Sequence, residues 1–254
     1  MSIHVAESPG RLRLTLDAPN GNAITDAMVG AMRAAVDSLD GRTPPVKLVT
    51  VEGAGADFSF GSSLPEHVPA RMPDVLPRFH ALVRALIGAP AVTAALVQGR
   101  CLGGGFELAL ACDFVFAADD AVMGLPEIAV GAFPPVGSVL LPLKIGAARA
   151  ASAILSGGPR PVGDWQQAGL IEQVVPRAEL SGAVDRWYAW TLEKQSAAAL
   201  RHAAQASRLT VSSALDSLLP HAERRYLNEL LATADAAEGV TAFLEKRAPR
   251  WKDA

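Results

Sequence analysis

Short strand-like runs alternate with helical runs along the first two-thirds of the chain, and this order limits the folds available to it. Residues 11–16 alternate apolar and polar side chains, as a half-buried strand does, and residues 46–51 and 92–97 are typical of buried strands. A helix that begins after the Thr25 cap and another over 79–87 separate these strands. This alternation predicts an α/β fold with a largely parallel, layered sheet.

Further short elements complete this first part of the chain. Residues 19–22 have the composition of a turn, and residues 106–112 are predicted to form a helix after a glycine-rich loop. Residues 114–116 and 121–123 are predicted to form short strands.

The end of the chain has a different pattern. From about Ala147 the periodicity is helical, and beyond Leu192 no segment has the composition of a strand. Three segments repeat apolar side chains at helical spacing: 197–209, 214–231 and 235–246. Such a helical region needs a surface to cover, either its own core or another subunit. We therefore divide the chain into a core, residues 1–192, and a helical region, residues 193–254.

The overall composition excludes several classes of protein. Of the 254 residues, 50% are hydrophobic and 19% are charged, which excludes a disordered chain. The net charge is −3 and the 23 basic residues are scattered, so we expect no nucleic-acid partner. The N-terminus lacks the pattern of a signal peptide, and the nearly apolar residues 85–97 are too few to span a membrane.

The cysteines and histidines suggest neither a disulfide framework nor a metal site. Two cysteines, Cys101 and Cys112, cannot form such a framework, and no Cys–His cluster has the spacing of metal ligands. We therefore expect a soluble, cytoplasmic, globular protein without a bound metal, and an enzyme is the favoured class.

The most unusual stretch is residues 99–107, Gly-Arg-Cys-Leu-Gly-Gly-Gly-Phe-Glu, between a predicted strand and a predicted helix. Glycines allow close backbone approach, and the free N–H groups of a helix start suit a phosphate or a developing oxyanion. The stretch is neither a GxGxxG motif nor a P-loop. Tight packing of strand and helix would also explain the glycines.

Two carboxylic acids stand in apolar surroundings. Glu107 would lie in the first helical turn after the glycines, beside Phe106 and Leu108, and Glu127 follows Pro126. Burial disfavours an ionised carboxylate and raises its pKa, which suits general acid–base catalysis. An interaction of Glu107 with the helix dipole and an exposed position for Glu127 are the simpler alternatives.

A second glycine-containing loop, residues 58–64, follows a predicted strand and holds Ser62 and Ser63. Loops at strand ends commonly carry the sites of α/β proteins. A serine nucleophile would need a histidine and a carboxylate, and His67 and His80 are the nearest histidines. Because both histidines fit surface positions, a serine hydrolase is the less favoured interpretation.

Several short motifs occur in a fixed order along nearly the whole chain. They are Pro19-x-x-Asn22-Ala23, Phe58-x-x-Gly61-x-x-Leu64, Gly103 to Ala109, Pro126-Glu127-Ile128, Leu155-Ser156-Gly157, Ala168 to Ile171 and Glu238 to Arg247. In this combination the chain resembles the crotonase (enoyl-CoA hydratase/isomerase) superfamily. Each motif alone is weak, whereas their combination and order are specific.

The resemblance implies a fold and a chemistry. It implies a spiral of ββα units in residues 1–192 and a helical trimerisation region in residues 193–254, assembled as a homotrimer or a dimer of trimers. It also implies a coenzyme A thioester as substrate. No metal or redox cofactor is expected, because the thioester itself acidifies the adjacent carbons.

The resemblance also assigns residues. The two backbone N–H groups that hold the thioester oxygen in the family correspond to Ser62 and Gly104, and the two hydratase glutamates correspond to Glu107 and Glu127. Positions expected to contact the substrate or its coenzyme A part are Asn22, Ala23, Phe60, Gly61, Ser62, Leu64, Gly103, Phe106, Phe133, Phe243 and Lys246.

A second set of residues points to one group within the superfamily. The set comprises residues 58–63 with Glu66, His67 and Pro69, then Phe79-His80-x-Leu82, and Gly131-x-Phe133-x-Pro135 followed by Leu140-Leu141-Pro142. It resembles the hydratases that act on cyclohexa-1,5-diene-1-carbonyl-CoA in the anaerobic degradation of benzoyl-CoA. The alternatives are a straight-chain 2-enoyl-CoA hydratase, an enoyl-CoA isomerase and, in another class, a non-catalytic acyl-CoA binding protein.

The chain departs from the family pattern at three places. Pro134-Pro135 stands where many hydratases have glycines that help to hold the catalytic water, and proline has no N–H to donate. Ser63 replaces a common aspartate, and Asp17-Ala18 stands where a basic residue is often found. Because Pro134 and Pro135 cannot donate, the catalytic water must be held by other groups in this chain.

Overall fold

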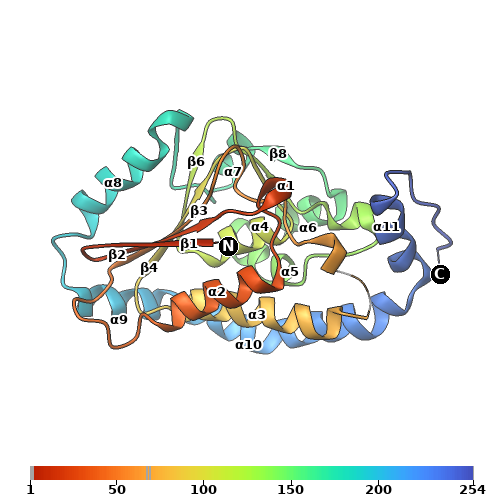
Figure 1. Ribbon diagram of the computed structural model, residues 1–254, viewed down its shortest axis with the longest axis horizontal. Coiled ribbons are helices and arrows are strands. Elements are labelled where there is room, and N and C mark those ends of the chain that lie inside the picture. Colours follow the sequence, from red (N-terminus) through yellow and green to blue (C-terminus); the bar gives the residue numbers. More distant parts are fainter. Residues whose placement is uncertain (1–2, 67, 69, 254) are drawn as a thin grey trace.

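The structure is a computed structural model that describes residues 3–66, 68 and 70–253. Two β-sheets form the frame of the protein (Figure 1). The larger sheet has six strands in the order β1-β2-β3-β4-β6-β9. Their bounds are Ile3–Ser8, Arg11–Leu16, Leu48–Gly53, Val92–Val97, Phe114–Ala118 and Gln173–Val175. β1 pairs with β2 in the antiparallel sense, and the pairs from β2 to β9 are parallel, so the predicted parallel sheet is confirmed.

The smaller sheet has three strands in the order β5-β7-β8, with bounds Arg100–Leu102, Val122–Gly124 and Arg160–Pro161. β5 follows β4 after a two-residue link and leads directly into helix α4, Gly104–Ala111. The chain therefore passes from the large sheet to the small one just before its glycine-rich segment. This passage brings that segment out of the large sheet and toward the helices.

Eleven α-helices of the described residues surround the sheets, with four 3-10 turns and one π-helical turn. The helices other than α4 are α1 Pro19–Asn22, α2 Asp26–Asp37, α3 Met72–Gly88, α5 Pro135–Ile145, α6 Ala147–Ser156, α7 Val162–Gln167, α8 Leu180–Thr191, α9 Ala197–Ser207, α10 Leu209–Arg224 and α11 Ala234–Leu244. The shorter turns are η1 Leu64–Glu66, η2 Pro126–Val130, η3 Arg177–Glu179, the π-helical η4 Arg225–Glu229, and η5 Leu230–Ala232.

Alternating side chains of the central strands supply both faces of the large sheet. Val49 and Val51 of β3 join the core formed with α2, α3 and α4, whereas Leu48 faces the cluster that contains Val184 and Tyr188 of α8. Both faces are buried, as is usual for parallel strands. Figure 1 shows α2, α3 and α10 side by side below the sheet, and α8 apart from them on the other side.

The helices begin where local chemistry favours it. The Thr25 hydroxyl caps α2 by accepting a hydrogen bond from the N–H of Met28, as expected from the sequence. The helices predicted over 106–112, 197–209 and 235–246 are present within a few residues of those bounds. The segment predicted over 214–231 is α10 followed by its π-helical turn and η5.

The turn predicted at 19–22 is present: α1 is a single turn in which Asn20 and Gly21 have positive φ and so depart from helical geometry. Other predicted elements were wrong. The loop predicted over 99–105 contains β5, and the region predicted as helical after Ala147 contains the short strands β8 and β9. Strands of two or three residues are too short to show a period, and β1, with only Ile3 buried, shows no alternation.

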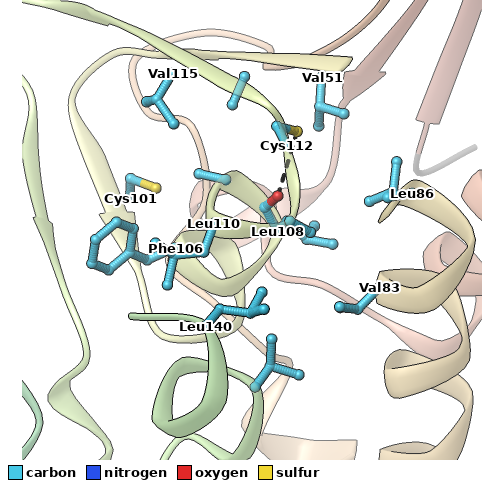
Figure 2. Close-up of a cluster of buried hydrophobic side chains, with 14 of the residues drawn as sticks. Val51, Val83, Leu86, Cys101, Phe106, Leu108, Leu110, Cys112, Val115 and Leu140 are labelled. Carbon is cyan, nitrogen blue, oxygen red and sulfur yellow. Dashed lines mark hydrogen bonds between the residues drawn. The ribbon is translucent and has the colours of Figure 1, made fainter. Parts of the chain in front are cut away.

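Helix α4 lies at the centre of the main core, and all eight of its residues are buried. Figure 2 shows Phe106, Leu108 and Leu110 of this helix among side chains from the neighbouring strands and helices. Cys101 and Cys112, just before and just after the helix, are both buried free thiols. A helix that is apolar on every side packs only when it is enclosed, so its position is fixed from all directions.

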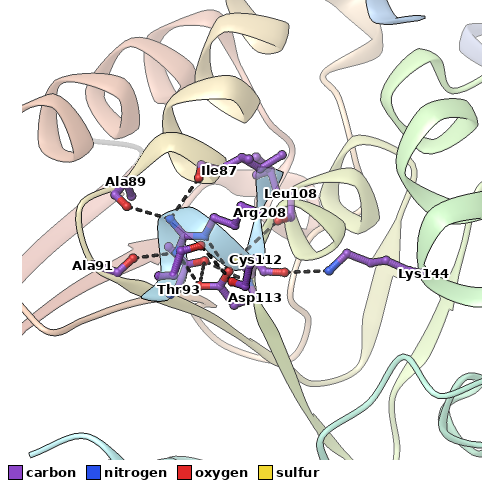
Figure 3. A network of polar contacts seen from close by, with 11 residues as sticks. Ile87, Ala89, Ala91, Thr93, Leu108, Cys112, Asp113, Lys144 and Arg208 are labelled. Carbon is purple, nitrogen blue, oxygen red and sulfur yellow. Dashed lines mark hydrogen bonds and ion pairs between the residues drawn. The ribbon is translucent and has the colours of Figure 1, made fainter. Parts of the chain in front are cut away.

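An arginine fixes the helical region to the core of its own chain. Arg208, between α9 and α10, is 5% exposed and donates to Asp113 and to the carbonyls at the end of α3 and the start of β4 (Figure 3). The acceptors are the backbone oxygens of Ile87, Ala89 and Ala91, at 3.0, 2.7 and 2.7 Å. The helical region therefore covers its own core, and its predicted role in oligomerisation stays a prediction.

Replacing Arg208 by Ala should destabilise the fold strongly. The change leaves Asp113 and three carbonyls without their buried partner, which typically costs roughly 3–5 kcal/mol. Urea unfolding measures the loss. Arg201→Ala is the control, because Arg201 pairs with Asp40 at the surface, where such pairs contribute about 1 kcal/mol or less. Equal losses for the two variants would contradict the structural role of Arg208.

Candidate active site

A cavity of about 550 Å³ lies between β5 of the small sheet, the helices α2, α3 and α4, and the C-terminal elements η4 and α11. Most of the predicted site residues line it: Phe60, Gly61, Ser62, Leu64, Gly103, Gly104, Glu107, Glu127, Phe133 and Phe243. The structure thus brings together residues from both glycine-containing loops, from α4 and η2, and from the C-terminal region. Its walls are mainly apolar, with a few polar groups, as in most small-molecule sites.

The two glycine-containing loops meet at one edge of this cavity. Ser59 pairs with Cys101 as a parallel bridge, and the N–H of Leu102 donates to the carbonyl of Ser59 at 2.9 Å. Gly61 has a φ of +95°, and a Cβ there would lie 2.8 Å from the carbonyl oxygen of Leu102. Only glycine therefore permits the loops to approach this closely.

This approach places the backbone of Ser62 beside the first residue of α4. A Cβ built on Gly104 would lie 2.7 Å from the Ser62 hydroxyl oxygen and 3.5 Å from the Ser62 backbone nitrogen. The N-terminus of a helix carries partial positive charge and free N–H groups. Ser62 and Gly104 therefore lie where two backbone donors can serve one oxygen atom in the cavity.

Glu107 lies in the first turn of α4 and is 5% exposed. One carboxyl oxygen accepts a hydrogen bond from the N–H of Gly137 at 2.8 Å. Burial raises the pKa of this carboxyl to about 7, although the backbone N–H groups of Gly137 and Val136 act in the opposite direction. The group can therefore exchange protons near neutral pH.

Glu127 faces the same cavity from η2. Burial, and then the charge of Glu107, raise the pKa of Glu127 to about 8. Its Oε2 is buried and has no hydrogen-bond partner within the described part of the chain. A Cβ on Gly103, where φ is +50°, would lie 2.8 Å from Oε1, so the glycine makes room for the carboxyl group. Two such groups oppose each other's ionisation, so one holds a proton while the other is charged.

The cavity lining also contains polar residues that the sequence did not mark as site residues: Thr25, Asp26, Arg100 and Tyr226. Tyr226, on the π-helical turn η4, lines the cavity and is 7% exposed. The sequence of this region indicates only helix, and nothing in its period shows that the helix winds differently at this turn. No motif marks the residue, so only the three-dimensional arrangement reveals it.

Four predicted contact residues do not line the cavity. Phe106 was wrongly predicted to line it: the ring is fully buried against Trp165, with 4.7 Å between ring centroids. The Asn22 side-chain amide donates to the carbonyls of Ala54, Asp57 and Phe58 and so closes a turn. Ala23 and the exposed Lys246 also lie outside the set of lining residues.

Of the two histidines nearest to the serine-containing loop, His80 is the one that the structure describes. His80 points from α3 to α10, where its Nδ1 lies 2.6 Å from the Glu223 carboxyl group, and it does not line the cavity. His67 and Pro69, two of the residues singled out from the sequence, lie outside the described residues. The two carboxyl groups in the cavity, Glu107 and Glu127, are the arrangement that supports acid–base chemistry.

The sequence profile of the family described as enoyl-CoA hydratase/isomerase matches residues 8–254. The chain belongs to the enoyl-CoA hydratase/isomerase family. The predictions of a crotonase-type fold and of an enzyme of this family are therefore confirmed. Enzymes of this family act on acyl-CoA substrates.

Individual relatives support this assignment along almost the whole chain. A cyclohexa-1,5-dienecarbonyl-CoA hydratase from Thauera aromatica is 38% identical over 242 residues, which cover 95% of this chain and 93% of the relative. A 2,3-dehydroadipyl-CoA hydratase from Escherichia coli K12 is 33% identical over 247 residues, covering 95% and 94%. The crystal structure of an enoyl-CoA hydratase from Mycobacterium avium subsp. paratuberculosis K-10 has a TM-score of 0.89 and 29% identity, covering 100% and 99%.

Membrane-spanning helices and clusters of metal-ligating side chains were sought among the described residues. None of the described helices is both long and apolar enough to cross a membrane. No group of three or more histidine, cysteine, aspartate or glutamate residues in this described part could hold a metal ion.

The raised pKa values of the glutamates predict a pH-dependent stability. Folded protein binds more protons than the unfolded chain between pH 4.5 and about 8, so its free energy of unfolding should fall as the pH rises through this window. In Glu107→Gln/Glu127→Gln this fall should be much smaller. Chemical unfolding at a series of pH values tests this, with exposed Glu172→Gln as the control. An unchanged pH dependence in the double variant would contradict the burial argument.

Proposed function

We propose that this enzyme adds water to cyclohexa-1,5-diene-1-carbonyl-CoA and forms 6-hydroxycyclohex-1-ene-1-carbonyl-CoA. The observation that carries the proposal is the pair of buried carboxyl groups, Glu107 and Glu127, facing one apolar cavity beside the backbone of Ser62 and Gly104. The similarity to a hydratase named for this substrate supports the choice of the acyl group.

The reaction begins at the thioester carbonyl. We place its oxygen between the N–H groups of Ser62 and Gly104, which strengthen their hydrogen bonds as negative charge develops there. The charged carboxyl group of the glutamate pair takes a proton from water, and the water oxygen bonds to the carbon β to the carbonyl. The electron pair of the double bond between the α and β carbons moves toward the thioester oxygen, and the two N–H donors stabilise the negative charge there.

The reaction ends with a proton transfer to carbon. The delocalised electron pair returns to the ring, and the carbon at the far end of the conjugated diene takes the proton held by the second carboxyl group. Burial and mutual repulsion keep one carboxyl group protonated when the other is charged, so the pair starts each cycle with one acid and one base. This mechanism requires neither a metal nor a redox cofactor.

The residues that form the cavity wall beside Glu127 suit a flat, rigid substrate. Pro134 and Pro135 both line it, and proline restricts backbone motion. Phe133 and Phe60 supply flat apolar surfaces, which suit a six-membered ring. A ring holds the hydroxylated carbon and the protonated carbon at a fixed separation, and a stiff wall maintains the matching separation of the two carboxyl groups.

A second candidate is the hydration of a linear 2-enoyl-CoA. The similarity to a 2,3-dehydroadipyl-CoA hydratase favours it, because that relative is matched almost as completely. A non-catalytic acyl-CoA binding protein is the weaker alternative, since it has no use for two buried carboxyl groups whose desolvation is unfavourable. A homo-oligomer is also proposed, because large apolar side chains such as Trp190 and Leu155 are exposed on the single chain.

Removing either acid should abolish most of the activity without unfolding the protein. Glu107→Gln and Glu127→Gln keep the side-chain shape but cannot accept or deliver the proton, so turnover should fall by at least about 100-fold. Steady-state hydration assays with circular dichroism on the same samples measure this. Near-normal turnover in either variant would show that the residue is structural.

The substrate assignment is tested by a ratio. We expect kcat/KM for the cyclic dienoyl thioester to exceed that for crotonyl-CoA by about 100-fold or more, because a misplacement of about 1 Å typically costs that much. Both thioesters are assayed under one set of conditions. A ratio near one, or in favour of crotonyl-CoA, would reject the cyclic substrate and favour the linear alternative.

A further inference from the structure

Among the polar side chains of the cavity, one comes from the C-terminal region. Tyr226 is almost completely buried, and its ring packs on Phe133 with centroids 5.4 Å apart in a T-shaped arrangement. It lines the same cavity as Glu107 and Glu127. It lies on a single π-helical turn at the end of α10, and such turns occur frequently at functional sites.

The helix that leads into the turn carrying Tyr226 is fastened to α3, which also lines the cavity. Three residues before it, the Glu223 carboxyl group contacts Nδ1 of His80 on α3 at 2.6 Å, and His80 is 3% exposed. Arg84, one turn further along α3, donates to the carbonyl of Leu215 on α10 at 2.9 Å. These contacts hold the end of α10 against α3, and the packing on Phe133 holds the tyrosine ring.

The backbone of residues 134–137, beside Glu107, has no free hydrogen-bond donor, because the N–H groups of Val136 and Gly137 bond Glu107. A water molecule between two carboxyl groups can give its protons to them, but its oxygen then needs a donor to fix it. Pro134 and Pro135 have no N–H groups, and the N–H of Gly137 already binds Glu107 at 2.8 Å. A neutral phenol can donate one hydrogen bond, which is the function that this stretch of backbone does not provide.

We propose that the Tyr226 hydroxyl group is a third functional group of the reaction centre, donating a hydrogen bond to the water oxygen that is added to the substrate. This inference rests on the proposed hydratase function. Burial and the charges of Glu127 and Glu107 raise the pKa of this phenol to about 12, so it keeps its proton at neutral pH. The hydroxyl then remains a donor in both ionisation states of the glutamate pair.

The kinetic test removes one oxygen atom. Tyr226→Phe should lower kcat by roughly 10- to 100-fold, the usual effect of losing one hydrogen bond to a reacting group, with little change in KM and in melting temperature. The matched control is Tyr188→Phe, because Tyr188 is the other of the two tyrosines of the chain. It lies on α8 below Arg11 and outside the cavity lining, so this variant should keep its kcat. Full kcat in Tyr226→Phe would overturn the proposal.

A spectroscopic test does not depend on turnover. In Tyr188→Phe the remaining tyrosine is Tyr226, so tyrosine labelled with ¹³C at Cζ gives one NMR resonance. This resonance should move as the glutamates titrate near pH 7 and 8, and the movement should disappear when both are replaced by glutamine. A resonance that stays constant over this range would overturn the proposal. If the wild type hydrates no thioester, the proposed function is wrong. The pH dependence of the resonance then still shows whether the Tyr226 hydroxyl lies near the two carboxyl groups.

Discussion

The site depends on the close contact between two backbone segments, residues 59–62 and residues 101–104. The bridge between Ser59 and Cys101 and the hydrogen bond from Leu102 to Ser59 hold these segments in register. The same contact determines where α4 begins, and the start of α4 determines how deeply Glu107 is buried. One packing contact therefore sets both the backbone donors and the first carboxyl group, so a distortion in one loop would affect the whole reaction centre.

The sequence predicted those strands and helices that are long enough to show a clear period of apolar residues. The strands around residues 11–16, 46–51 and 92–97 and the Thr25 cap follow from apolar period and capping chemistry, and the structure contains all of them. The edge strand β1 could not be predicted, because it buries only one side chain and therefore carries no alternation. The final strand, β9, has three residues and is defined by its neighbour β6.

The site was predictable in part, for an equally physical reason. The apolar neighbours of Glu107 and Glu127 indicate burial, and the structure places both carboxyl groups at one cavity. Phe106 was wrongly predicted to contact the substrate because α4 is buried on every side. The spacing of its apolar residues therefore does not show which face of the helix lies toward the cavity. Tyr226 was missed because a π-helical turn redirects one side chain without leaving a trace in the spacing of apolar residues.

The two cysteines flank the helix that carries Glu107, and this has a practical consequence. Burial raises the pKa of Cys101 well above its ordinary value and the pKa of Cys112 to about 12, so neither thiol reacts while the helix is enclosed. Reaction with a thiol reagent then requires the surrounding elements to separate first. The rate of alkylation therefore reports how often α4 is uncovered, so these thiols serve as a built-in probe of local opening at the centre of the molecule.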